Sequence, residues 1–244
     1  MNRIAALLQS SIGRKLVMAA TGVLLLAFLI VHLLGNLYVF QGREPLNSYA
    51  AWLKDNPLIW PARARIGLLG LFGLHIWVGI SLARENRAAR PVGYRRGLAH
   101  PSSTWTSRSM AVTGTLVLAF LVFHLAHFTW GWILPDAHAL RDTEGRHDVY
   151  GMVLAGLRTP WIAAIYLFSM AILAVHLSHA GQSFLQTLGI RYEHGNRIVR
   201  GLGYGLVLIV IVGNLLLPTL VFIGVGSGSD GVDAVARAAL ETSP

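Results

Sequence analysis

The chain has 244 residues, of which 54% are hydrophobic and 13% are charged, and its formal net charge is +9. This balance is far from that of soluble domains and excludes an ordinary water-soluble globular protein. The basic residues stand between long apolar runs without interleaved aromatic residues, which argues against a nucleic-acid-binding surface. Cysteine is absent, so disulfides, iron–sulfur clusters and thiolate ligation of a metal are excluded.

Five apolar segments are each long enough to cross a bilayer, since about 20 apolar residues in a helix span a hydrocarbon core of about 30 Å. They cover residues 16–40, 66–83, 110–134, 161–188 and 198–225. The sequence therefore predicts an all-α integral membrane protein in which five transmembrane helices form one bundle within residues 1–226. The first segment is too long for the apolar part of a signal peptide, so we expect it to remain as a span.

Basic residues are distributed unequally between the two ends of the predicted bundle. Arginine and lysine concentrate in residues 1–15, 84–109 and 189–200, whereas the other loops and the C-terminal tail have nearly balanced charge. Positively charged loops are retained on the cytoplasmic side. We therefore expect a multi-pass protein of a bacterial-type cytoplasmic membrane, with the N-terminus in the cytoplasm and the C-terminus outside. Residues 227–244 are predicted to form an exposed tail with a short helix at residues 232–240.

Four histidines lie deep inside different apolar segments, where titratable side chains are rare. They are His32, His75, His124 and His176. Counting about 1.5 Å per residue from the nearest basic flank places His32 and His124 roughly 24–26 Å from the cytoplasmic boundary, in the outer half of the membrane. The same count places His75 about 14 Å from that boundary and His176 about 27 Å from the outer one, so both fall in the inner half. The spacing thus predicts two depth-matched pairs.

Two imidazoles at one depth on different helices are suited to bind one haem iron axially from both faces, which leaves no open position and favours electron transfer. The pattern predicts two stacked haem b groups, an outer one held by His32 and His124 and an inner one held by His75 and His176. A lone intramembrane histidine more often forms an interhelical hydrogen bond or lines a pore. A zinc site is a weaker alternative because H-E-x-x-H is missing, and a proton relay usually needs carboxylates, which the five segments lack.

Two of these histidines belong to doublets, His124 with His127 and His176 with His179, whose members share nearly the same helix face. The spacing alone leaves the ligand of each doublet open. Three longer strings stand around these positions: T-G-V-L-L-L-A-F-L-I-V-H at Thr21–His32, F-H-L-A-H-F at Phe123–Phe128 and H-L-S-H-A-G-Q-S-F-L-Q-T-L-G at His176–Gly189. Over about residues 10–225 the chain resembles the cytochrome b membrane-anchor subunit of succinate dehydrogenases and fumarate reductases, in its five-helix, two-haem form.

The resemblance implies one axial ligand from each of the first four helices, with the first helix paired to the third and the second to the fourth. It places ligation on the first member of each doublet and leaves His127 and His179 as neighbours of the ligands, propionate contacts or structural residues. Arginines near helix ends are further candidates for the haem propionates, because guanidinium binds carboxylate in a two-pronged manner. These are Arg14, Arg84 and Arg108.

The resemblance also implies two partner proteins, a flavoprotein that interconverts succinate and fumarate and an iron–sulfur protein that connects it to the membrane. The chain itself would not act on succinate but would exchange electrons with a membrane quinone, by resemblance menaquinone. The basic cytoplasmic surface, densest at residues 84–96, is suited to an acidic partner surface and equally to anionic lipid headgroups.

A quinone site needs an apolar crevice near a membrane surface with polar or titratable groups at its mouth. The predicted outer loop after the first span offers such groups, with Glu44 as a proton acceptor. The candidates are Asn36, Glu44, Asn47, Tyr49, Trp52, Lys54 and Asp55. Each of them also fits an ordinary interfacial loop with an aromatic belt. A polar insertion at residues 135–158, which more compact members of the family lack, is expected outside the membrane as well.

Two other functions fit the same segments. The first is the cytochrome b anchor of another membrane oxidoreductase, such as a hydrogenase or a formate dehydrogenase, in which the haem ligands are distributed differently. The second comes from another class and is a haem-free transporter or channel with a polar histidine core. The reduced-minus-oxidised spectrum of the purified protein separates this second alternative from a dihaem cytochrome.

Overall fold

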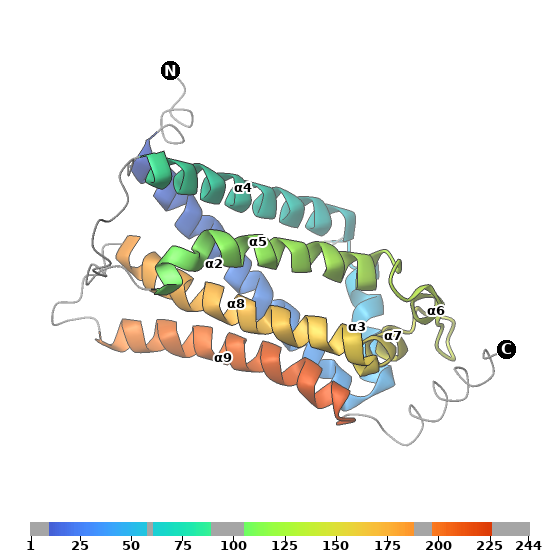
Figure 1. Ribbon diagram of the computed structural model, residues 1–244. Coiled ribbons are helices and arrows are strands. Elements are labelled where there is room, and N and C mark those ends of the chain that lie inside the picture. Colours follow the sequence, from blue (N-terminus) through green and yellow to red (C-terminus); the bar gives the residue numbers. More distant parts are fainter. Residues whose placement is uncertain (1–9, 58–60, 89–104, 188–196, 226–244) are drawn as a thin grey trace.

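The computed structural model describes residues 10–57, 61–88, 105–187 and 197–225, so the predicted tail and its short helix lie outside the described residues. Within these ranges the chain is helical and has no strand, which confirms the all-α fold class. Five helices are long and apolar enough to cross a membrane. They are α2 Ser11–Asn36, α4 Pro61–Ala88, α5 Trp105–His124, α8 Pro160–Thr187 and α9 Arg197–Phe222 (Figure 1). α4 is longer at both ends than the predicted segment 66–83.

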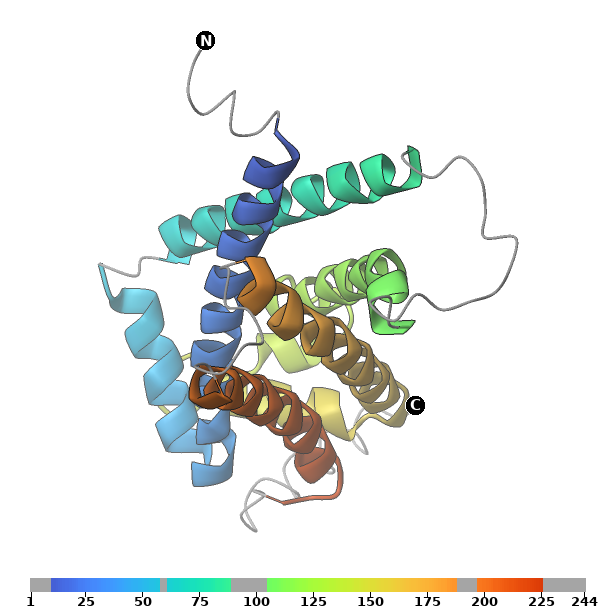
Figure 2. The same cartoon turned by 90° about the vertical axis from the view of Figure 1, so that its left-hand side faces the viewer.

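The spanning helices form one bundle with α8 near its centre (Figure 1, Figure 2). α8 packs against both α5 and α9, while α2 packs mainly against α4 and crosses the bundle to reach α8 and α9. α2 begins and α9 ends at opposite ends of the bundle, as an odd number of spans requires. The side of the membrane that each end faces stays a prediction.

Local sequence explains where the first span begins and ends. Ser10 caps α2 by accepting a hydrogen bond from the Gly13 amide at 2.9 Å. The helix continues into a 3₁₀ turn, η1 Leu37–Gln41, after which Gly42 adopts a φ of 107° that favours glycine. This break allows the next residues to form a separate short helix, α3 Arg43–Asp55.

The third span ends earlier than predicted. α5 continues as a π-helical turn, η2 Leu125–Thr129, and the helix stops there rather than at residue 134. Gly131 lies in the left-handed region with a φ of 68°, and the Trp132 amide turns back to the Ala126 carbonyl at 2.8 Å. The apolar run up to residue 134 therefore leaves the helix, which hydropathy alone does not reveal. A π-helical turn widens a helix locally and often accompanies a functional site.

The insertion 135–158 is not the purely polar segment that we expected. It contains a short helix, α6 Pro135–Ala139, and a second helix, α7 Val149–Arg158. Most of α7 is buried, and Leu154 at its centre is 1% exposed. Ten residues are too few to span a bilayer, so this apolar helix buries its side chains against the rest of the protein.

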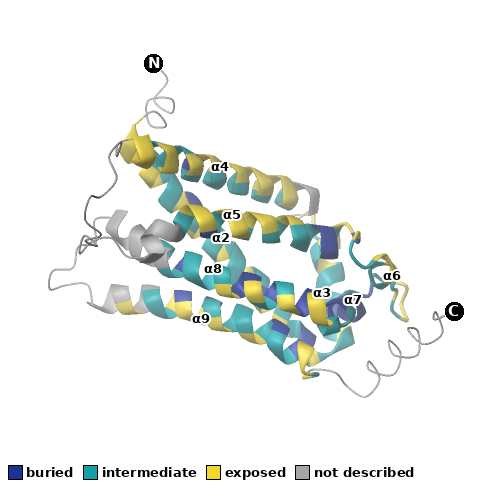
Figure 3. Cartoon of the chain, in the orientation of Figure 1, coloured by how far each residue is buried: buried dark blue, intermediate teal, exposed yellow. Residues whose placement is uncertain are grey.

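The main apolar core lies at the end of the bundle where α8 begins and α9 ends. It comprises Val39, Leu46, Tyr150, Val153, Leu154, Leu157, Ile162, Tyr166 and Val221. We call residues 37–55 and 130–159 the cap. The end of the bundle that the cap covers is called the capped end, and the opposite end is called the open end. Along the spans many large apolar side chains are instead exposed, as the yellow faces in Figure 3 show. Helices that face lipid present such surfaces.

Candidate functional site

His32 of α2 and His124 of α5, the predicted outer pair, lie side by side. Their ring centroids are 5.8 Å apart and the rings are nearly perpendicular. One turn earlier on each helix, Phe28 stacks on His32 at 5.4 Å and Phe120 lies 5.8 Å from His124. Two imidazoles that bind one metal ion through bonds of about 2 Å have ring centroids about 6 Å apart. At this spacing both rings would be able to hold one iron.

His75 and His176, the predicted inner pair, each face a threonine of the preceding spanning helix. The Nδ1 atom of His75 lies 2.9 Å from Oγ1 of Thr21 on α2. The Nδ1 atom of His176 likewise lies 3.2 Å from Oγ1 of Thr113 on α5. A metal-binding histidine commonly uses one ring nitrogen for a neighbouring oxygen and the other for the metal. Both rings are thus held in a manner that suits ligation through Nε2.

The two threonines were not predicted as site residues, because each apolar segment was interpreted by itself. They occupy equivalent positions of an internal repeat, because the pattern T-G-x-L-x-L-A-F-L-x-x-H occurs at Thr21–His32 and again at Thr113–His124. In each copy the last residue belongs to the pair at 5.8 Å, and the first residue contacts a histidine of the other pair. Aligning the first span with the third would have revealed them.

The two histidines of the α5 doublet have different environments. The hydroxyl of Tyr166 lies 3.1 Å from the Nδ1 atoms of both His124 and His127. His127 is 1% exposed, and its Nε2 atom has no hydrogen-bond partner within the described part of the chain. A methyl group at Gly156 of α7 would lie only 2.6 Å from that nitrogen, so the His127 ring is directed at the cap. His124 is instead paired with His32, which favours His124 as the ligand.

The side chains predicted to contact haem propionates have different surroundings. Arg14 forms an ion pair with Glu85, which links α2 to α4 at the open end. Arg84 is exposed near the end of α4. The side chains of Arg108 and His179 lie outside the described residues, although α5 and α8 include both positions.

The candidates for a quinone site lie in and beside the cap. Asn36 donates a hydrogen bond to the His32 carbonyl at 2.8 Å. Tyr49 stacks between Tyr38 and Trp52, with centroid distances of 5.0 and 6.2 Å. Its ring also lies against the backbone of residue 35, where an added methyl group would be 2.7 Å away. Asn36 and the Tyr49 ring therefore both lie near the end of α2, about one turn beyond His32. Trp52, Lys54 and Asp55 are exposed.

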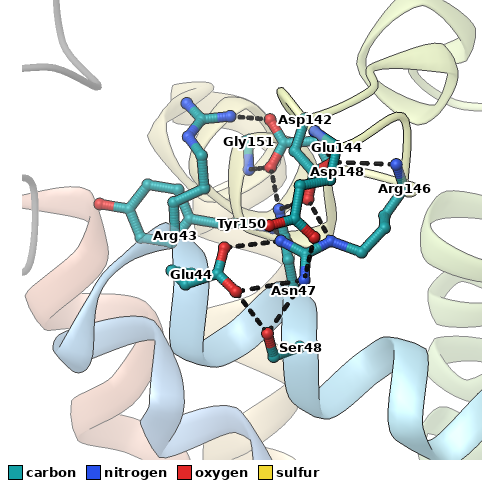
Figure 4. Close-up of polar contacts among 10 residues, drawn as sticks. All are labelled: Arg43, Glu44, Asn47, Ser48, Asp142, Glu144, Arg146, Asp148, Tyr150 and Gly151. Carbon is teal, nitrogen blue, oxygen red and sulfur yellow. Dashed lines mark hydrogen bonds and ion pairs between the residues drawn. The ribbon is translucent and has the colours of Figure 1, made fainter.

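The other two candidates, Glu44 and Asn47, belong to a polar cluster that fastens α3 to the segment 142–151 (Figure 4). We call this cluster the clasp. It comprises Arg43, Glu44, Asn47, Ser48, Asp142, Glu144, Arg146, Asp148, Tyr150 and Gly151. Asp148 caps α7 by accepting a hydrogen bond from the Gly151 amide at 3.1 Å. The same buried carboxylate accepts a hydrogen bond from Asn47 at 2.9 Å and pairs with Arg43.

Arg146 is the second centre of the clasp. Its guanidinium donates to Glu44 at 2.6 Å, to Asp142 at 2.7 Å and to Ser48 at 3.0 Å. The hydrogen bonds from Arg146 and Ser48 lower the pKa of Glu44, and its carboxylate partners raise the pKa of Arg146. Glu44 is therefore an ionised partner of Arg146, and this geometry does not favour it as a proton acceptor near neutral pH.

Two histidines without further ligands would suit haem better than a bare metal ion. Among the residues that the structure describes, no group of three or more His, Cys, Asp or Glu side chains could hold a metal. A macrocycle supplies the equatorial ligands itself and needs only axial ligands from the protein. Comparisons of the chain with protein-family models, with curated proteins and with solved structures find no match. The functional assignment therefore depends on the arrangement of the residues and on the resemblance of the three strings.

Proposed function

We propose that the chain is the dihaem cytochrome b subunit that anchors a succinate dehydrogenase in the cytoplasmic membrane and exchanges electrons with quinone. The observation that carries the proposal is the arrangement of histidines from four spanning helices. His32 and His124 lie 5.8 Å apart beside the cap, and the other two rings are held through Nδ1 by threonine hydroxyls. The resemblance in the first, third and fourth spans supports the identity of the complex.

Each side chain has a definite role in this proposal. His32 and His124 would hold one haem b, and His75 with His176 would hold the other. Haem held by these residues would supply one-electron transfer. The protein contributes orientation of the rings, aromatic packing beside the outer pair, and a cap that separates this pair from water.

The two ends of the bundle would serve different partners. The open end carries the basic residues that suit docking of an acidic iron–sulfur protein, which in turn would bind the flavoprotein that acts on succinate. We place the quinone, menaquinone by resemblance, beside Asn36 and Tyr49, since both lie one turn beyond His32. The aromatic stack of Tyr49 with Tyr38 and Trp52 offers flat surfaces for a quinone ring.

Purification of the intact membrane complex tests the proposal. We expect two haems of b type per chain in the reduced-minus-oxidised spectrum, co-purification of a flavoprotein and an iron–sulfur protein, and reduction of haem by succinate. A chain without haem would contradict the cytochrome and favour a transporter or channel. Two haems that formate or hydrogen reduces, and succinate does not, would keep the cytochrome but reassign its complex.

A further inference from the structure

We infer that Thr21 and Thr113 are positioning residues for the inner pair of histidines and select the ring nitrogen that each presents to iron. The inference rests on the proposed haem function and deepens it. Both threonines lie within the membrane-spanning part of the chain, and both use the hydroxyl oxygen to contact the Nδ1 atom of a histidine on another helix.

Hydrogen-bond chemistry determines the direction of the first contact. The hydroxyl of Thr21 has one hydrogen, and its Oγ1 atom lies 2.8 Å from the carbonyl of Val17, four residues earlier. A carbonyl only accepts, so the hydroxyl donates there, and Nδ1 of His75 donates to Oγ1 at 2.9 Å. The ring then carries its proton on Nδ1 and a lone pair on Nε2, which is the form that binds a metal.

The second contact repeats the first on the other side of the bundle. Oγ1 of Thr113 lies 3.2 Å from the carbonyl of Met110 and 3.2 Å from Nδ1 of His176. With the same directions as at Thr21, the hydroxyl donates to the carbonyl and Nδ1 of His176 donates to Oγ1, which leaves the lone pair of this ring on Nε2. Two helices of matching sequence thus present two histidines in the same tautomer.

A glycine follows each threonine and allows the histidine ring to approach the helix. A methyl group added at Gly22 would lie 3.6 Å from Cε1 of His75, and one added at Gly114 would lie 3.4 Å from Cε1 of His176. These are van der Waals distances, so each ring lies directly against the helix that carries the threonine. In both copies of the repeat the threonine contacts a ring nitrogen and the following glycine lies beside a ring carbon.

The repeat also places the two threonines at one level. Each stands eleven residues before the histidine of its own helix, which is about 16 Å along an α-helix. Because His32 and His124 meet at 5.8 Å, the positions eleven residues before them lie at similar depth, and the rings that they hold do too. α2 and α5 therefore each supply a histidine ligand to one haem and a threonine that positions a ligand of the other.

Replacement of the hydroxyl by a methyl group tests the inference on the intact complex. Loss of a hydrogen-bond partner of a metal-binding histidine costs roughly 10–100-fold in metal affinity. We expect Thr21→Val and Thr113→Val each to weaken retention of one haem by about that factor, measured as transfer to apomyoglobin, and to raise the midpoint potential of that haem. The affected haem should be the one that His75→Ala removes, and Thr21→Ser and Thr113→Ser should restore wild-type behaviour.

A matched control is available on the same helix. The hydroxyl of Thr115 is exposed and donates to the Ala111 carbonyl at 2.9 Å, so Thr115→Val should change neither haem. Wild-type retention and potential in both Thr→Val variants, or an effect on the haem that His32→Ala removes, would overturn the inference and leave the dihaem function standing. A wild-type complex without haem would overturn both. If Thr21→Val does not accumulate, Thr113→Val reports on the same haem from its other ligand.

Discussion

At the scale of single residues, His124 at the end of α5 and His127 in η2 differ in what their rings contact. His124 is paired with His32, whereas the ring of His127 is packed against Gly156 of the cap. We therefore expect His124→Ala or His32→Ala to remove the same haem, and His127→Ala to retain two haems per chain. The ratio of haem to protein and the spectrum of the remaining haem measure this. Loss of haem in His127→Ala with retention in His124→Ala would reverse the ligand assignment.

The packing of Gly156 leads to a separate prediction, because the ring of His127 occupies the space that a side chain at this position would need. A methyl group there would meet Cε1 and Nε2 of the ring, and overpacking of this kind typically costs about 1–3 kcal/mol. Gly156→Ala should lower the thermal unfolding midpoint of the protein in detergent, and the double variant with His127→Ala should recover part of the loss. Gly205→Ala in α9 is the control, because a methyl group there meets nothing within 4 Å. Equal destabilisation in the single and double variants would contradict this packing.

At the scale of elements, the spans were predictable and the cap was not. A run of about 20 apolar residues indicates a membrane helix without reference to any other segment. α7 is also apolar but has only ten residues, and the charged residues before it made the whole insertion look polar. Its burial depends on contacts such as that of Asn47 with Asp148, which are distant in the sequence. Such contacts leave no periodic signal in either segment.

The clasp gives the cap a predictable response to acid. Hydrogen bonds from Arg146 and Ser48 lower the pKa of Glu44. Burial raises the pKa of Asp142, but hydrogen bonds from Arg146, the Glu144 amide and Asn47 together leave it lowered. A carboxylate with a lowered folded pKa stabilises fully above its unfolded value of about 4, and this contribution is lost as the pH falls through the folded value. Burial lowers the pKa of His147, so its contribution is likewise full above about pH 6.5 and declines below it.

Two stages of loosening should follow on acidification. Hydrogen exchange of α3 and α7 should accelerate modestly below about pH 6.5 and strongly below about pH 4. His147→Gln should abolish the first stage and Glu44→Gln should reduce the second. Exchange rates, corrected for their intrinsic pH dependence, that stay constant between pH 7 and pH 3 would show that the clasp does not hold the cap.

At the scale of the whole molecule, the depth of each histidine follows from its own segment, whereas the contacts of its ring depend on how the helices pack. Depth in the membrane follows from the rise per residue, which is why the sequence predicts two levels of histidine. The contacts of the inner rings could not be read from one segment, since they depend on how the helices pack: Thr21 of α2 contacts His75 of α4, and Thr113 of α5 contacts His176 of α8. Under the proposed function, this polarity, with a basic open end and a neutral cap, would place the soluble partner at the open end and the quinone beside the cap.

This polarity predicts an orientation, and the absence of cysteine makes the orientation directly measurable. Glu144 in the cap has a side chain that is 61% exposed, and its ion pair with Arg146 at 3.2 Å is a surface contact of little energetic weight. Arg87 is exposed in the last turn of α4, at the open end. Because the basic end should stay in the cytoplasm, a membrane-impermeant maleimide should label Glu144→Cys in intact spheroplasts and Arg87→Cys only after the membrane is opened. The wild-type chain supplies the unlabelled control, and the opposite pattern would put the cap in the cytoplasm and transfer the docking of the iron–sulfur partner to it.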